Sequence, residues 1–246
     1  DPNSEIRRYG KKIFEMNFKR LFRFFFASQF PKLALSLRLR STNTLASDYF
    51  LKLFIDTVKY REENAVRRND FMQILIDLKN SKEGLGLELT ELASESFLFF
   101  GGGFETTSTT ITYALYEMAQ NHEIQSQLRD EIEQVLNEND NNLTYELLSD
   151  MKYLNMVISE TLRKYPPIPL TMRRSTEKFR IPNTLLDVPE GISVFIPTLG
   201  FHHDPKYYPE PDKFIPERFT EENIQTRPAF SYLPFGEGPR NCLGMR

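Results

Sequence analysis

One short segment, Phe235-Gly-Glu-Gly-Pro-Arg-Asn-Cys-Leu-Gly244, constrains the fold of this chain more than any other. It contains Cys242, the single cysteine among 246 residues, with Arg240 two positions upstream and glycines on both sides. The glycines let a flat ligand approach the backbone closely. A thiolate held in such a turn can be the axial ligand of a haem iron, and the arginine can pair with an anionic propionate. An isolated cysteine is more often an inert core residue, but the spacing of the whole motif favours the ligand.

Composition excludes several other classes of protein. A net charge of −3 gives no support for nucleic-acid binding. A single cysteine excludes an internal disulfide framework and suits a reducing compartment. The longest strongly apolar run, about Phe97 to Phe104, is far shorter than the roughly 20 residues that a spanning helix needs. A hydrophobic content of 40% is enough for a sizeable core.

Hydrophobic periodicity predicts a helical body followed by a proline-rich tail with a small sheet. The fold class is therefore mainly α with a small β portion. The most extended element is a predicted helix from Thr90 to about Asn121. Shorter helices are expected to about Glu15 and over 18–30, 47–68, 70–79, 122–139 and 144–165, and short strands over Phe179–Ile181 and Ser193–Ile196. A further helix from about Met245 would place Cys242 near a helix N-terminus, which stabilises a thiolate.

The long helix contains Gly101-Gly-Gly-Phe-Glu-Thr-Thr107 at its middle. Each glycine inside a helix costs about 1 kcal/mol relative to alanine, so three in a row predict a local bulge that a flat group could approach. Glu105 and Thr106 could relay protons, as general acid catalysis requires. The alternative is a packing notch in which the Thr hydroxyls bond back to the helix carbonyls.

These motifs resemble those of the cytochrome P-450 monooxygenases. The resemblance extends to three longer phrases: Phe-Phe-x-x-Gly-Phe-Glu-Thr, Glu-Thr-Leu-Arg-Lys-Tyr-Pro-Pro and Tyr-Leu-Pro-Phe-Gly-Glu-Gly-Pro-Arg-Asn-Cys. They look most like the microsomal insect P-450s of family six, many of which oxidise plant toxins and insecticides. The resemblance implies a haem b cofactor, iron protoporphyrin IX, with Cys242 as its axial ligand and metal-binding residue. It assigns cofactor binding to Phe235, Gly238, Arg240, Cys242, Gly244 and Arg173.

The resemblance also assigns the remaining site residues. Gly102 takes the first position of the family's oxygen-activating motif, which makes Glu105 and Thr106 catalytic. Glu160, Arg163 and Arg218 correspond to a buried structural Glu–Arg–Arg set. Arg173 is expected to be the second propionate-binding arginine, with the adjacent Arg174 as its rival. Six apolar side chains are expected to line the substrate pocket: Phe99, Phe100, Phe104, Ile168, Leu170 and Met172.

The function that the resemblance implies is insertion of one oxygen atom from O2 into an apolar small molecule. The substrate would be a xenobiotic, a plant toxin, an insecticide or a lipid-like compound. NADPH electrons would arrive through NADPH–cytochrome P-450 reductase, with cytochrome b5 as a further partner. The protein would lie at the cytoplasmic face of the endoplasmic reticulum membrane. The aromatic and basic segment 18–30 suits a membrane contact, and core packing with extended arginines is the alternative.

The chain is expected to be one part of a single P-450 catalytic domain, from the lid helices to the haem-thiolate loop. Both ends look cut, so the fold would be partial, without an N-terminal anchor and a C-terminal end, and the fragment alone is expected to be inactive. Two alternatives remain open. One is a non-catalytic truncated product, and the other is a P-450-fold isomerase or dehydratase that needs no reductase. The sequence does not define the substrate.

Overall fold

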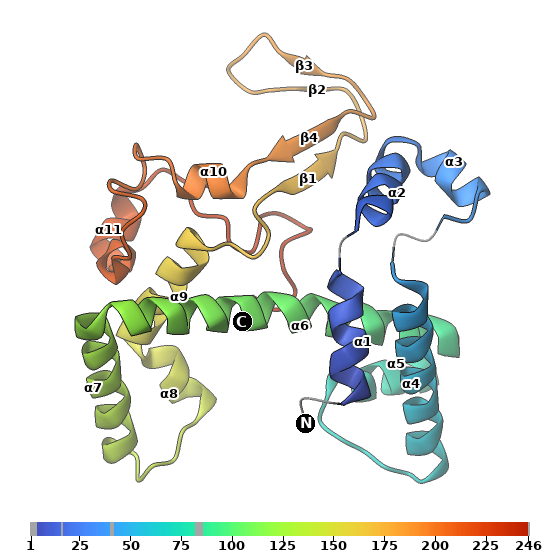
Figure 1. The fold of residues 1–246 in the computed structure, drawn as a ribbon, viewed down its shortest axis with the longest axis horizontal. Coiled ribbons are helices and arrows are strands. Elements are labelled where there is room, and N and C mark those ends of the chain that lie inside the picture. Colours follow the sequence, from blue (N-terminus) through green and yellow to red (C-terminus); the bar gives the residue numbers. More distant parts are fainter. Residues whose placement is uncertain (1–3, 16, 40–41, 82–85, 246) are drawn as a thin grey trace. The chain divides into compact units, whose positions relative to one another are not determined.

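The computed structural model describes residues 4–15, 17–39, 42–81 and 86–245 (Figure 1). The chain forms two compact units, Asp1–Glu105 and Thr106–Arg246, which are described separately below. Both are dominated by helices, and the described strands are short. The predicted fold class, mainly α with a small β portion, is confirmed.

The regular secondary structure in the described residues of the first unit is all α-helix. Polar side chains cap four of its helices, because the side-chain oxygens of Ser4, Asn17, Asn43 and Asp70 each accept a backbone N–H of the following first turn. Its elements are α1 (Glu5–Phe14), α2 (Phe18–Gln29), α3 (Pro31–Ser36), α4 (Thr44–Glu63), α5 (Phe71–Asn80) and the first part of α6 (Leu89–Gln120).

Helix α4 differs most from its predicted range of 47–68. It begins at Thr44 because Asn43 caps it, and it ends at Glu63. Just beyond its end, Ala65 adopts a φ angle of 52°, which an α-helix cannot contain. Residues 64–68, which include Arg67 and Arg68, therefore lie outside the helix. Two hydrophobic clusters hold the unit together, one around Ile13, Ala46 and Phe50 and the other formed by Val58, Leu75, Ile76 and Leu92.

The second unit joins helices to a small amount of sheet. Strand β1 pairs antiparallel with β4, Thr171 opposite Ile196, and β2 pairs with β3, Phe179 opposite Val188. Its elements are the rest of α6, then α7 (His122–Glu138), α8 (Tyr145–Asp150), α9 (Lys152–Lys164), β1 (Thr171–Arg174), β2 (Phe179–Arg180), β3 (Asp187–Val188), β4 (Ser193–Ile196), α10 (Thr198–His202), the 3-10 helix η1 (Pro216–Phe219) and α11 (Glu221–Thr226).

A buried cluster and a side-chain cap fix α9, which carries part of the candidate site. Met118, Tyr153, Val157 and Phe214 form the hydrophobic core of this unit. The Glu131 carboxylate on α7 accepts the backbone N–H groups of Tyr153 and Leu154, both at 2.8 Å. An acidic side chain at a helix N-terminus satisfies groups that the helix leaves unpaired and complements its dipole.

The glycine run does not produce the expected bulge. Helix α6 is a regular α-helix through Gly101, Gly102 and Gly103. The cost of three glycines is small beside the hydrogen-bond ladder of a helix of 32 residues, which continues across them. A Cβ added at any of the three would meet nothing within 4 Å among the described residues, so no other described element packs closely against these three positions.

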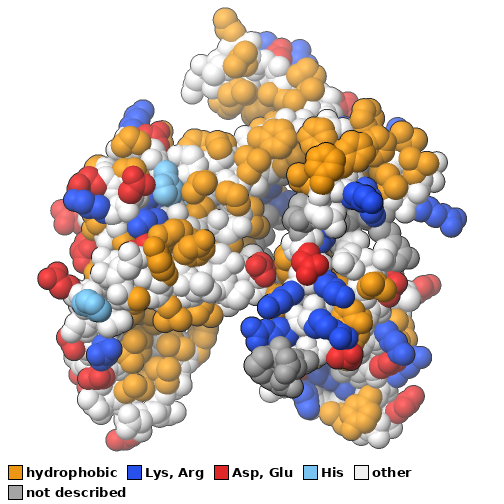
Figure 2. All heavy atoms as spheres, viewed as in Figure 1, with side chains coloured by type: hydrophobic (Ala, Val, Ile, Leu, Met, Phe, Trp, Pro, Cys, Tyr) orange, Lys and Arg blue, Asp and Glu red, His pale blue; other side chains and the backbone are white. Residues whose placement is uncertain are grey.

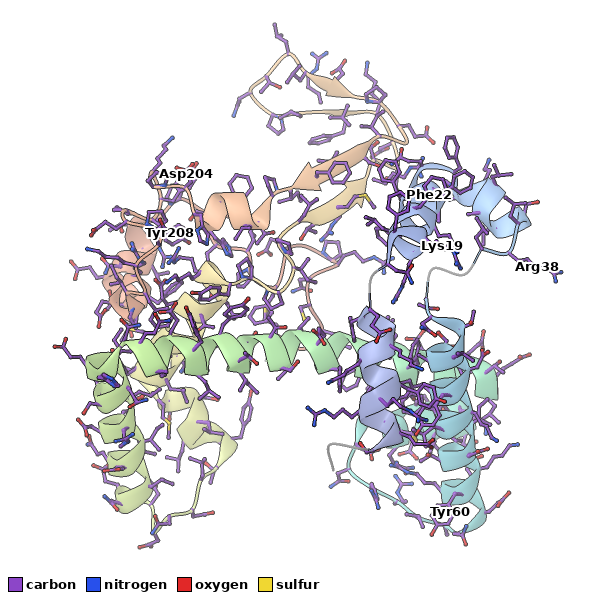
Figure 3. The ribbon with its side chains drawn as sticks, in the orientation of Figure 1. Lys19, Phe22, Arg38, Tyr60, Asp204 and Tyr208 are labelled. Atoms are coloured by element: carbon purple, nitrogen blue, oxygen red, sulfur yellow. The ribbon has the colours of Figure 1, made fainter. Side chains whose placement is uncertain are left out.

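Exposed hydrophobic side chains gather over α2 and α3 (Figure 2). Phe18 is 83% exposed and Phe22 is 61% exposed, and α2 has no buried residue. Lys19 lies on the same helix as Phe22 (Figure 3). Of the two interpretations of segment 18–30, core packing therefore finds no support in the first unit. Within the described residues, none of the helices has both the length and the apolar content needed to cross a membrane.

Candidate functional site

The cysteine loop is a compact turn closed by its own backbone. The N–H of Cys242 donates to the carbonyl oxygen of Phe235 at 2.9 Å, which brings the two ends of the motif together. Gly236 and Gly238 adopt φ angles of 71° and 82°, a left-handed conformation that other residues rarely take. The motif glycines at these two positions are thus required by the backbone path.

The thiol of this loop is accessible. Cys242 is exposed, as are Arg240 and Gly244, and a Cβ added at Gly244 would meet nothing within 4 Å among the described residues. The next side chain, Leu243, is 81% exposed. An exposed thiol, apolar neighbours and a nearby guanidinium are the groups that a flat, apolar, dianionic haem requires. The residues of the loop therefore fit this cofactor.

The side chains of the two candidate arginines on β1 point toward different parts of the second unit. The Arg173 Nη2 atom lies 3.8 Å from the position that a Cβ on Gly236 would occupy, so its guanidinium lies beside the cysteine loop. The Arg174 Nε instead donates to the carbonyl oxygen of Gly191 at 3.0 Å. The structure thus brings Arg173, rather than Arg174, to the candidate haem site.

A buried ion cluster lies between α9 and the proline-rich tail. Glu160 and Arg163 are fully buried, and the guanidinium binds the carboxylate through Nε–Oε2 at 2.6 Å and Nη2–Oε1 at 2.8 Å. The Arg218 Nε lies 3.4 Å from Glu160 Oε1, as an ion pair without hydrogen-bond geometry. Burial lowers the pKa of Arg218, and the Glu160 charge opposes that shift. The three residues named from sequence are therefore in contact.

Arg163 also organises the backbone of the tail. Its Nη1 donates to the His202 carbonyl at 2.9 Å, and its Nη2 donates to the Pro211 carbonyl at 2.8 Å. The backbone N–H of Ile215 donates to Glu160 Oε1 at 2.9 Å. The cluster therefore links one helix to three separate points of the proline-rich tail.

The oxygen-side motif lies on α6, where Glu105 is exposed and Thr106 is half-buried. The Thr110 hydroxyl donates to the Thr106 carbonyl at 3.0 Å, and the Thr112 hydroxyl donates to the Ser108 carbonyl at 2.7 Å. Hydroxyls bonded back to the helix are what the packing-notch alternative predicts for this region. With these bonds the helix stays regular around Thr106, the residue that was predicted to deliver protons.

The six predicted pocket residues fall into two groups. Phe99, Phe100 and Phe104 line a cavity of about 480 Å³ in the first unit. Phe100 also packs against the core residue Phe50, with ring centroids 4.7 Å apart. In the second unit, the remaining three side chains lie exposed on and before β1: Ile168, Leu170 and Met172.

Sequence reasoning missed two buried polar groups of the second unit. Glu117 of α6 accepts the Lys164 ammonium at 2.8 Å and the Tyr165 hydroxyl at 2.5 Å. His202 is fully buried next to the Glu–Arg–Arg cluster. A polar residue inside an apolar helix was the available signal for Glu117, and no comparable signal marked His202. Among the described residues, no group of three or more His, Cys, Asp or Glu could hold a metal ion.

Comparison with known proteins gives consistent matches. The family model described as cytochrome P450 matches residues 1–246. The chain is 45% identical over 220 residues, 88% of its length, to "Probable cytochrome P450 6a20" of Drosophila melanogaster, covering 44% of that protein. It is 43% identical to "Cytochrome P450 6a2" of the same fly and 41% identical to "Cytochrome P450 6k1" of Blattella germanica, over 100% of the chain and 50% and 51% of those proteins. The chain therefore spans about half the length of the curated relatives that it matches.

Proposed function

We propose, from the premise that this chain belongs to the cytochrome P450 family, that the protein is a haem-thiolate monooxygenase. It inserts one oxygen atom from O2 into an apolar small molecule. The observation that carries this proposal is the cysteine loop, which presents the exposed thiol of Cys242 on a turn closed by the Phe235 carbonyl, with Arg173 beside it. We further propose that residues 1–246 form part of a single catalytic domain.

When bound by the Cys242 thiolate, haem would supply oxygen activation, which an electron-rich thiolate ligand favours. The hydrogen bond from the Cys242 N–H to the Phe235 carbonyl holds the sulfur in position. Arg173 and Arg240 would hold the two propionates, since a guanidinium binds a carboxylate through two parallel hydrogen bonds. The Glu–Arg–Arg cluster holds the tail that carries the loop. The aromatic side chains Phe99, Phe100 and Phe104 of α6 would offer apolar contacts to a substrate.

The defining test is the absorption spectrum of the full-length protein after reduction and addition of CO. A thiolate-type band, together with reductase-dependent use of NADPH and O2 for product formation, is the expected result. A thiolate-type band without any need for a reductase or O2 would instead identify an isomerase or dehydratase. Absence of the band from a folded, haem-loaded protein would refute the proposal.

The two β1 arginines give a matched pair of variants. Replacement of Arg173 by leucine is expected to lower the fraction of protein that retains haem, because one propionate loses its charged partner. A hydrogen bond to a charged group contributes about 1.5–3 kcal/mol, so haem affinity should fall roughly tenfold to a hundredfold. Arg174→Leu removes the same charge from the neighbouring position and should retain haem. Equal losses in both variants, measured by haem transfer to an acceptor protein, would contradict the assignment.

Thr106 is proposed to deliver protons during oxygen reduction, with Glu105 as the proton source. Thr106→Ala should leave haem binding intact, lower product yield and divert NADPH electrons to peroxide. General acid catalysis typically contributes about 10²–10⁴-fold, so the loss of product should be large. Thr112→Ala makes the same chemical change six residues further along the helix and serves as the control. Unchanged coupling of NADPH to product in Thr106→Ala would exclude the role.

The substrate class, partners and location are proposed on the same premise. The aromatic cavity residues favour an apolar substrate, such as a plant toxin, an insecticide or a lipid-like compound. Electrons would come from NADPH–cytochrome P450 reductase, with cytochrome b5 as a second donor, at the cytoplasmic face of the endoplasmic reticulum. The exposed Phe and basic residues of α2 support a membrane contact there, since apolar and cationic side chains together suit an anionic interface.

A further inference from the structure

His202, the last residue of α10, is the most unusual polar side chain in the second unit. It is fully buried, and its Nε2 accepts the backbone N–H of Leu233 at 2.8 Å. Its ring stacks on Tyr232, with centroids 5.2 Å apart, and meets the edge of Tyr208 at 6.4 Å. Tyr208 lies in the segment between α10 and α11 (Figure 3). His202 thus contacts the segment that leads directly into the cysteine loop.

The accepted bond determines the chemical state of the ring. A ring nitrogen that accepts an N–H is unprotonated, so His202 must be neutral, with its proton on Nδ1. Nδ1 makes no hydrogen bond of ordinary geometry among the described residues. Burial lowers the pKa of His202 to about 4, which keeps the imidazole neutral at physiological pH.

His202 connects the buried ion cluster to the thiol loop through both its backbone and its side chain. The His202 carbonyl accepts Arg163 Nη1 at 2.9 Å, while the ring accepts the Leu233 N–H. The Leu233 carbonyl then accepts the N–H of Gly236 at 3.2 Å, and the following turn is closed by the Cys242 N–H. A continuous set of contacts therefore runs from the guanidinium of α9 to the backbone of the ligand cysteine.

We infer that His202 is a positioning residue for the cysteine loop, acting through its neutral Nε2 on the Leu233 amide. This inference rests on the proposed haem-thiolate function. The Glu–Arg–Arg cluster holds the tail in place. His202 in turn holds the backbone at Leu233, from which the chain runs into the loop that positions the Cys242 sulfur. Loss of the acceptor frees the start of the loop without disturbing the ion cluster.

Two amide variants test the acceptor directly. In His202→Gln the side-chain oxygen can reach about the position of Nε2, whereas in His202→Asn the oxygen lies near the position of Nδ1 and cannot reach Leu233. Both are neutral and polar. His203→Gln is the matched control, because the neighbouring ring bonds to the Lys164 carbonyl at 2.9 Å and not to the loop.

The first readout is amide hydrogen exchange at Leu233 in the full-length holoprotein, and the second is the fraction of thiolate-type CO spectrum. An unpaired buried N–H costs about 1–3 kcal/mol, so exchange at Leu233 in His202→Asn should be roughly tenfold to a hundredfold faster. His202→Gln and His203→Gln should keep both wild-type values. If Asn and Gln at position 202 behave alike, or if Leu233 exchanges unchanged in His202→Asn, the inference is wrong.

Acid provides an independent test, because a protonated imidazole cannot accept a hydrogen bond. The titratable and charged groups that face the ring are Arg163 and, through it, Glu160, together with His203, Tyr208 and Tyr232. Their net effect on the pKa of His202 is smaller than the effect of burial.

An unfolded histidine has a pKa of about 6.5, well above the folded value, so the unfolded chain binds more protons as the pH falls. This contribution to stability is complete above pH 6.5 and declines from there to about pH 4, by up to about tenfold in the folding equilibrium per pH unit. His202→Gln should lack this part of the decline. If the free energy of unfolding fell equally with decreasing pH in wild type and His202→Gln, the neutral Nε2 acceptor would be refuted.

The CO spectrum and the Leu233 exchange rate together distinguish failure of the inference from failure of the proposed function. If wild-type protein folds and binds haem but shows no thiolate-type band, the proposed function fails, whereas Leu233 exchange still reports on the anchor. If wild type shows the band and His202→Asn keeps both the band and slow Leu233 exchange, the inference alone fails.

Discussion

Replacement of Cys242 by serine is expected to abolish the thiolate-type CO spectrum and all oxygenase activity of the full-length protein. The hydroxyl of serine is a far weaker ligand, because it stays protonated where a thiol can ionise. The loop itself should survive, since the bond that closes it joins the backbone of residue 242 to the Phe235 carbonyl. The change is therefore chemical rather than conformational.

A second variant separates loss of the thiolate from loss of haem. In Cys242→His, an imidazole at the same exposed position can bind haem iron through nitrogen. Haem content should recover, while the CO band shifts to that of a nitrogen-ligated haem and activity stays absent. The measurements are haem stoichiometry, the CO spectrum and product formation. A Cys242→Ser protein that kept the thiolate-type band would exclude Cys242 as the ligand.

Arg163→Ala is expected to give little folded, haem-loaded protein. It leaves the buried Glu160 carboxylate with the Ile215 N–H and with Arg218, at the longer distance of 3.4 Å, as its one remaining charged partner among the described residues. It also removes donors from the His202, Pro211 and Lys213 carbonyls. Breaking a buried ion pair by removing one partner costs about 3–5 kcal/mol, a large share of a domain's usual 5–15 kcal/mol. The urea midpoint of unfolding is the measurement.

Arg180→Ala is the matched control for this prediction. Arg180 also pairs with a carboxylate at 2.6 Å, Asp187, but it is an exposed residue on β2. Water screens such pairs, so its removal should shift the midpoint much less than removal of Arg163. A soluble, fully loaded but inactive Arg163→Ala protein would instead indicate a catalytic role for Arg163.

The sequence predicted the elements whose signals are local. Helix α6 has a long apolar pattern, and its observed bounds, Leu89–Gln120, differ by one residue at each end from prediction. The predicted start of a helix at residue 70 is confirmed, because Asp70 caps α5. Strand β1 was missed, because Thr-Met-Arg-Arg has no apolar alternation and its conformation comes from pairing with β4. Helices α10 and α11 were missed because five and six residues are too few to show a period.

The sequence by itself determined the family of this protein and the chemistry that we propose for it, because the cysteine motif, the Glu-x-x-Arg pair and the Glu-Thr pair are contiguous or lie within a few residues. Tertiary structure alone decided which groups work together. It separated Arg173 from Arg174 by directing one toward Gly236 and the other toward Gly191. It also placed His202 against Leu233, 31 residues away. Such contacts depend on the path of an irregular, proline-rich tail, whose conformation is set by hydrogen bonds to distant buried groups rather than by local periodicity.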